Sequence, residues 1–240
     1  ETAAALAASS IAFSATNQAY ANTLRAHAIT LFTFANTYKG KYSTSIADAA
    51  IYYNSGDYWD ELTWAAAWLY RATGTASYLT TAQSLYSGHG IGNQNWAFSW
   101  DQKSPGVMAL MYKITGTQSY QTDFESFMTS WMPGGGMTYT PKGIAWRDQW
   151  GSLRYAANTA FLALMDADYV NATNPARART YFNWALGQIK LMVGDAGRSY
   201  VVGTHKNAST RPHSGFGYNP PTHPHHRAAS CPPVGTLNQF

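Results

Sequence analysis

The stretch YWDELTWAAAWLYRATGTASYLTTAQSLY, residues 58–86, decides the fold class of this 240-residue chain. Apolar side chains in its first half recur at the spacing of one helix face, namely Leu62, Ala65, Ala66 and Leu69. Gly74 follows, and glycine is the residue that most readily adopts the left-handed conformation ending a helix. The pattern predicts a helix over 58–73, a tight turn at the glycine, and a returning helix over 75–87.

The same turn is repeated further along the chain. Residues 73–80 and 115–122 share the pattern TGTxSYxT, at a spacing of 42 residues. Helical periodicity on both sides of such turns predicts four hairpins: 1–17 with 19–38, 58–73 with 75–87, 104–115 with 118–132, and 152–169 with 174–193. Repeats of this length are typical of stacked helix pairs, in an open solenoid or a closed ring. We therefore expect an all-α fold with few strands, in a single domain over residues 1–240.

Composition narrows the class of ligand. Only 12% of the residues are charged, whereas the chain contains 9 Trp, 17 Tyr and 10 Phe. The 16 Lys and Arg residues are scattered rather than clustered, so the sequence does not favour a nucleic-acid partner. No apolar run approaches the ~20 residues that span a bilayer, so we expect no membrane partner. An uncharged ligand with flat faces fits this composition best.

The segments that connect the predicted hairpins carry the unusual side chains. They are polar and rich in glycine or proline, and comprise residues 39–57, 88–103, 133–151 and 197–240. If they share one rim of a ring, they form a surface for ligand binding. Their tyrosine and tryptophan rings then line a cleft on which sugar rings stack, while arginine, histidine and aspartate bond the hydroxyls. The simpler alternative is that these rings close the core at the helix ends.

Three interpretations fit the histidine-rich segment GYNPPTHPHHRAASCP, residues 217–232. The first is a metal site, which would use His223, His225 and His226 with His205 or His213, although the spacing lacks the i, i+4 register of helical zinc motifs. The second is a set of structural histidines beside proline turns. In the third, prolines hold an extended backbone on which His225 and Arg227 point the same way, toward one sugar hydroxyl.

Taken together, these motifs resemble glycoside hydrolase family 9, the endoglucanases or cellulases. The matching blocks run in family order over nearly the whole chain: ETAAALAASS, YYNSGDYWDELTWAAAWLYRATG, FSWDQK, WGSLRYAANTAFLAL, and GRSYVVG with GYNPPTHPHHRAASCP. The resemblance implies an (α/α)6 barrel, of which this chain would supply about four of six hairpins and leave two helical faces uncovered. It implies inverting hydrolysis of β-1,4-glucan such as cellulose and cello-oligosaccharides, with no cofactor for catalysis.

The family motifs also imply roles for individual residues. His225 corresponds to the active-site histidine and Arg227 to its companion near the scissile sugar. The residues implied to bind substrate are Tyr53, Trp96, Trp150, Arg154 and Tyr155. Relatives hold a structural calcium near the SGxxxDE stretch, and the oxygen-rich residues that would provide its ligands here are Gly56, Asp57, Asp60, Glu61 and Asp101.

The resemblance is incomplete at the two catalytic carboxyl groups of the family. Inversion needs one carboxylate base and one carboxylic acid. The family takes its base from a DAGD motif upstream of residue 1 and its acid from a glutamate downstream of residue 240. Asp195-Ala196-Gly197 imitates DAGD but stands out of family order, and residues 204–215 read as an insertion. The chain therefore reads as the middle of a longer catalytic domain; alternatively, it is a noncatalytic sugar-binding fragment.

Family membership also implies secretion, although the chain shows no signal peptide. It starts without methionine, inside a helical pattern. Asn171-Ala172-Thr173 and Asn207-Ala208-Ser209 fit the glycosylation pattern of secreted proteins. Cys231, the single cysteine, excludes an internal disulfide framework. We therefore expect an extracellular protein.

Overall fold

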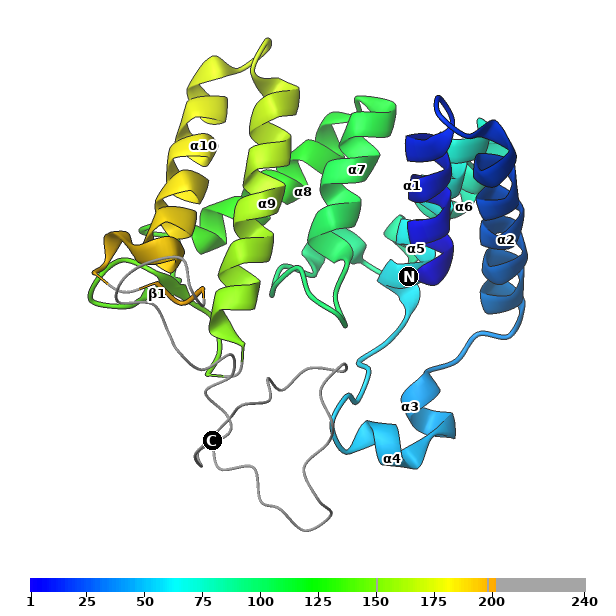
Figure 1. Ribbon diagram of the computed structural model, residues 1–240, viewed down its shortest axis with the longest axis horizontal. Coiled ribbons are helices and arrows are strands. Elements are labelled where there is room, and N and C mark those ends of the chain that lie inside the picture. Colours follow the sequence, from blue (N-terminus) through cyan, green and yellow to red (C-terminus); the bar gives the residue numbers. More distant parts are fainter. Residues whose placement is uncertain (150, 198, 202–240) are drawn as a thin grey trace.

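The computed structural model describes residues 1–149, 151–197 and 199–201, and these residues fold into four helical hairpins (Figure 1). The pairs are α1 (Thr2–Phe13) with α2 (Gln18–Thr37), α5 (Trp59–Thr73) with α6 (Ala76–Gly88), α7 (Ser104–Thr115) with α8 (Gln118–Trp131), and α9 (Ser152–Val170) with α10 (Pro175–Lys190). All four predicted hairpins are therefore confirmed. None of the described helices is long and apolar enough to cross a membrane.

The first helices of the hairpins pack against one another in chain order. α1 contacts α5, α5 contacts α7, and α7 contacts α9, while each also contacts its own returning helix. Alanine supplies many of the buried positions in this row, including Ala4, Ala66, Ala156 and Ala160, so the helices can approach closely. Larger buried rings, among them Phe124 and Trp131, fill the space beside α8.

The repeated TGT motif builds the same turn twice. Gly74 and Gly116 end α5 and α7 in the left-handed conformation, with φ of 71° and 67°. The Thr73 hydroxyl accepts from the backbone N–H of Thr75 at 3.1 Å, and the same bond links the N–H of Thr117 to Thr115 at 3.1 Å. A glycine and a threonine thus close each helix and turn the chain back.

Short elements occupy the long connections. Single-turn helices α3 (Tyr42–Ser45) and α4 (Ala47–Ala50) follow α2, and a 3-10 turn η1 (Ile91–Asn93) follows α6. Strands β1 (Thr138–Tyr139) and β2 (Ala145–Trp146) pair antiparallel, with Thr138 opposite Trp146. The last helix was expected to reach residue 193 but gives way to a π-helical turn η2 (Leu191–Asp195), where Gly194 adopts φ 136°.

The two ends of the hairpin stack carry different kinds of connection (Figure 1). The turns that join α1 to α2 and α9 to α10 lie at the upper end in this view, whereas α3, α4 and β1 lie at the lower end. The row of helices is open at its edge, where α9 and α10 expose Phe161, Met165, Phe182 and Leu186. Such exposure of large apolar side chains is what an incomplete ring leaves.

Candidate functional site

A cavity of about 350 Å³ lies where three connecting segments meet at the loop rim. The segment before α5, the segment between η1 and α7, and the first turn of α9 all contribute to its wall. Its lining includes Gly56, Asp57, Asp60, Trp96, Asp101 and Tyr155. The cavity therefore joins residues expected to contact substrate with residues expected to bind a metal, although the sequence separates them by up to about a hundred positions.

Trp96 is the most exposed of the aromatic residues that line this cavity, at 37%. Its ring meets that of Tyr155 edge to face, with centroids 4.9 Å apart. Tyr155 itself is only 5% exposed, and its hydroxyl accepts from Arg154 Nη2 at 2.9 Å. The exposed Arg154 guanidinium also lies over the Tyr155 ring, 4.7 Å from its centroid. Tyr155 thus supports the cavity wall, while Trp96 and Arg154 face solvent.

Tyr53 lies beside this cavity rather than in its lining. It is 51% exposed, and its ring meets Trp100, a lining residue, edge to face at 5.5 Å. The backbone carbonyl of Tyr53 accepts a hydrogen bond from the hydroxyl of Tyr42 in α3. The other residues singled out in the sequence lie outside the described residues, as does the 204–215 insertion; they are Trp150, Arg227, Cys231 and the histidines of the possible metal site, His205, His213, His223, His225 and His226.

An acidic cluster borders the cavity, with Asp57 and Asp60 in the cavity lining and Glu61 next to them. Asp57, Asp60 and Glu61 each offer an oxygen, and these oxygens lie within 4.8 Å of one another. Asp57 Oδ1 accepts from the N–H of Trp59 at 2.9 Å, at the start of α5. Carboxylates at a helix start bond free N–H groups and interact favourably with the helix dipole, which explains why the chain gathers acids here.

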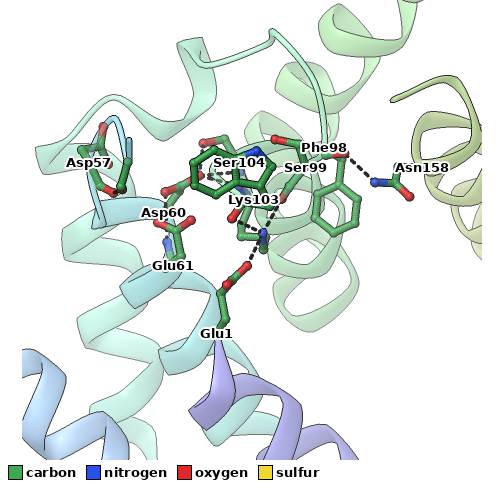
Figure 2. A network of polar contacts seen from close by, with 11 residues as sticks. Glu1, Asp57, Asp60, Glu61, Phe98, Ser99, Lys103, Ser104 and Asn158 are labelled. Atoms are coloured by element: carbon green, nitrogen blue, oxygen red, sulfur yellow. Dashed lines mark hydrogen bonds and ion pairs between the residues drawn. The ribbon is translucent and has the colours of Figure 1, made fainter. Parts of the chain in front are cut away.

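Asp60 joins two helices (Figure 2). It is 2% exposed, and its Oδ2 accepts from the backbone N–H of Lys103 at 2.5 Å and of Ser104 at 3.2 Å. These N–H groups lie at the start of α7, so the carboxylate caps α7 from α5. The motif gave no sign of this role, because the partners are 43 and 44 residues away.

The carboxyl group of Glu61 is bonded less completely. Its Oε2 is buried without a hydrogen-bond partner among the described residues. Burial raises the pKa of Glu61 well above its usual range, and the hydrogen bond and charge of Asp60 raise it further, while the backbone N–H of Glu61 itself and the charge of Lys103 oppose the shift. A hard cation would supply the missing partner and offset the repulsion between the two acids. The donor set of this cluster therefore fits an ion that prefers carboxylate oxygens.

Gly56 and Asp101 lie beside this cluster. Asp101 Oδ2 accepts from the N–H of Gly56 at 2.7 Å, and the Gly56 carbonyl accepts from Lys41 Nζ at 3.4 Å. Burial raises the pKa of Asp101, the Gly56 N–H opposes that shift, and the carboxylates of Asp60 and Asp57 add to it. The negative charge of the cluster thus contributes to the raised pKa of Asp101.

The loop that carries Trp96 and Asp101 is fixed from two sides (Figure 2). The buried ammonium of Lys103 donates to the carbonyls of Ser99 and of Trp100, the latter at 3.0 Å, and forms an ion pair with Glu1. From α9, Asn158 Nδ2 donates to the carbonyl of Phe98 at 2.9 Å. Both contacts are absent from any recognisable motif, and they give the cavity a rigid wall.

The site and the hairpin stack together define a class, an α-helical barrel protein whose loop rim carries an aromatic and acidic cavity. Residues 1–215 match Glycosyl hydrolase family 9, and the chain belongs to this family. Its four hairpins are part of the (α/α)6 barrel that the family resemblance implied.

Known relatives agree with this assignment. Endoglucanase B of Cellulomonas fimi is 44% identical over 241 residues, which cover 95% of this chain and 22% of that protein. The solved endoglucanase of the termite Nasutitermes takasagoensis is 45% identical with a TM-score of 0.84, covering 98% of this chain and 50% of that one. Endoglucanase CelQ of Clostridium thermocellum, solved with cellotetraose, is 37% identical with a TM-score of 0.78, covering 88% and 36%. The chain thus spans half or less of these relatives.

Proposed function

We propose that this chain is the central part of the catalytic domain of an endo-β-1,4-glucanase, a secreted cellulase. Its substrates would be cellulose and cello-oligosaccharides, cleaved at internal bonds with inversion. The observation that carries this proposal is the cavity whose lining joins Trp96 and Tyr155 with the carboxylates of Asp57, Asp60 and Asp101. Family membership and the cellotetraose bound by the related CelQ support the same ligand class.

Binding of a glucan follows from the surfaces around this cavity. The axial C–H groups of a glucose ring pack on a flat indole, and Trp96 offers such a face at the cavity wall. Arg154 is exposed beside it and carries N–H donors for hydroxyl groups. Tyr53 extends the aromatic surface through Trp100. We assign Trp150 to the same cleft on the WGSLRY motif alone.

In the proposed catalysis, residues of this chain hold the substrate, but they do not supply the two carboxyl groups that transfer protons. Inversion requires a base that activates water and an acid that protonates the leaving oxygen. We propose that both carboxylates lie outside these 240 residues, and that His225 and Arg227 hold the scissile sugar. The carboxylates of the cavity have other partners, since Asp57 caps α5 and Asp60 caps α7. The isolated chain would then bind glucan without cleaving it.

We further propose that calcium binds at the acidic cluster. Asp57, Asp60 and Glu61 would provide its protein ligands, with Asp101 and the backbone of Gly56 beside them. The buried, unpartnered Oε2 of Glu61 supports this assignment. Bound calcium would neutralise the cluster and stiffen the start of α5, and would take no part in bond cleavage.

Titration with cellohexaose, followed by tryptophan fluorescence, tests the glucan cleft. Trp96→Ala should weaken binding by roughly 1–3 kcal/mol, by analogy with the stacking of flat rings on aromatic side chains. Trp146→Ala is the matched control, because Trp146 is similarly exposed at 41% but does not line the cavity. Equal losses of cellohexaose affinity in both variants would contradict a glucan-binding cleft at Trp96.

A second assay separates the two functions of the chain. Carboxymethylcellulose should remain intact with the purified 240-residue protein, while cellohexaose still binds. Turnover above a blank would show that the catalytic carboxylates lie within the chain.

A further inference from the structure

Arg147 belongs to a segment that is unusually well fixed for a loop. It follows β2, and Gln188 of α10 holds that strand by accepting from the N–H of Ala145 at 2.8 Å and donating to the carbonyl of Gly143 at 2.9 Å. The Tyr139 hydroxyl of β1 donates to the carbonyl of the last residue of α8 at 2.7 Å. Two helices therefore anchor the strand pair, and the residue that follows β2 has a defined position.

The guanidinium of Arg147 lies over the ring of Trp96, with Cζ 5.2 Å from the ring centroid. The side chain is partly buried, and its Nε is buried without a hydrogen-bond partner among the described residues. Burial lowers the pKa of Arg147, which the neighbouring Asp148 opposes. The indole face therefore provides a favourable contact for a cation that is partly withdrawn from water.

A second aromatic contact also holds Trp96. The edge-to-face contact with Tyr155 fixes the orientation of the indole, and the hydrogen bond from Arg154 fixes Tyr155. The order of contacts is thus Arg147, Trp96, Tyr155 and Arg154. Because the Arg147 guanidinium covers one face of the indole, a sugar ring can stack only on the opposite face.

We propose that Arg147 is a positioning residue for the glucan cleft: it fixes the Trp96 indole and selects the face on which sugar stacks. The ligand in this inference rests on the proposed function, whereas the contact between the two side chains does not. Preorganising a binding surface lowers the ordering cost of association. Arg147 acts through Trp96, and no motif in the sequence marks it.

The first test uses the ligand-free protein. Emission from Trp96 is isolated as the difference between each protein and its Trp96→Phe counterpart. Arg147→Met should make this component more accessible to acrylamide, since the indole loses its cover. The matched control is Arg71→Met, because Arg71 lies over Trp68 on α5 at a comparable 5.1 Å but away from the cavity. An unchanged Trp96 signal in Arg147→Met would overturn the inference.

The second test measures cellohexaose affinity. A cation–π contact of ordinary strength predicts about 3- to 10-fold weaker binding by Arg147→Met. Arg147→Lys retains the positive charge and the aliphatic part of the side chain, so it should lose less affinity. This variant keeps the test valid if Arg147→Met folds poorly. In the Trp96→Phe background the effect of Arg147→Met should largely disappear. An equal loss in both backgrounds would mean that Arg147 contacts sugar directly, which would overturn the positioning role.

The two tests separate this inference from the proposed function. If the unaltered protein fails to bind cellohexaose, the glucan function is wrong, while acrylamide quenching still decides whether Arg147 fixes Trp96. If the protein binds cellohexaose but Arg147→Met behaves like Arg71→Met in both tests, the function stands and the inference is wrong.

Discussion

Two groups of buried carboxylates lie in different parts of this molecule, and they are balanced differently. In the helical core, Asp166 of α9 is 3% exposed and Arg177 of α10 lies 3.8 Å away, measured from Nε to Oδ2. Arg177 also pairs with Glu125 of α8. With its amide oriented to satisfy both neighbours, Gln121 donates to Asp166 at 3.3 Å and accepts from Arg177 Nη2 at 3.2 Å.

At the loop rim the acids are held by backbone N–H groups instead. Asp60 bonds the start of α7, Asp57 bonds the start of α5, and Glu61 Oε2 has no partner in the described part of the chain. Lys103, whose charge opposes the upward shift in the pKa of Glu61, donates to the carbonyls of Ser99 and Trp100 and pairs with Glu1. The core cluster thus contains its own cation within ion-pair distance, whereas the rim cluster is bonded mainly by backbone N–H groups, and the proposed calcium would add a cation there.

Removal of Arg177 has the largest expected effect, because it deprives the core cluster of its cation. Arg177→Met should lower the free energy of unfolding by about 3–5 kcal/mol, the usual cost of leaving a buried charge uncompensated. Urea unfolding followed by circular dichroism at neutral pH measures this. Arg179→Met, two residues away and exposed, should stay within about 0.5 kcal/mol of the unaltered protein. A loss below about 1 kcal/mol would show that the core does not depend on this balance.

Addition of calcium should have the next largest effect, and only at the rim. At a hundred times its dissociation constant, calcium should raise the free energy of unfolding by about 2.7 kcal/mol. Thermal unfolding with calcium, with magnesium and with a chelator measures the gain. Glu61→Gln should lose most of it, whereas Glu125→Gln, a carboxylate of the other cluster, should retain it. If calcium raised the free energy of unfolding equally in both variants, calcium would not bind at the rim cluster.

The pH dependence of Asp166 is the smallest expected effect. Burial raises the pKa of Asp166 to about 6, against the hydrogen bond from Gln121. The folded protein therefore holds this proton more tightly than the unfolded chain does, whose aspartates titrate near ~3.9. Stability from this group is greatest below pH ~4 and is lost as pH rises through ~6, by on the order of 2 kcal/mol.

Unfolding free energies measured between pH 4 and 7 test this sign. The loss on raising the pH should disappear in Asp166→Asn and persist in Asp168→Asn, an exposed neighbour on the same helix. A slope of the opposite sign for Asp166 would mean that Arg177 outweighs burial.

Much of the fold follows from local patterns. The stripe of Leu62, Ala65, Ala66 and Leu69 is buried as the spacing predicts, because helix periodicity alone determines which face meets the core. The TGT turns were equally predictable from glycine. The strand pair was not, because each strand has two residues and β2 depends on Gln188, 43 positions away from Ala145. A bond of that kind has no local signature.

The candidate site was predictable in its members but not in its arrangement. Sequence motifs named Trp96, Tyr155 and Asp60, and the structure brings them to one cavity. The near-complete burial of Tyr155 did not follow from the motif, since a motif records residue identity and not which atoms face solvent. Arg147 was missed because its contact with Trp96 depends on how two separate loops pack.

The opposed rims of the stack have a practical consequence. The tight turn at residues 171–173 is exposed and lies at the end away from the strand pair (Figure 1). Because exposed turn tips tolerate insertions, a fluorescent protein, a purification tag or a tether to a solid support can be grafted there. A group attached at that turn would leave the cavity at the opposite rim accessible. The protein can therefore be immobilised on a bead and still be exposed to soluble oligosaccharides.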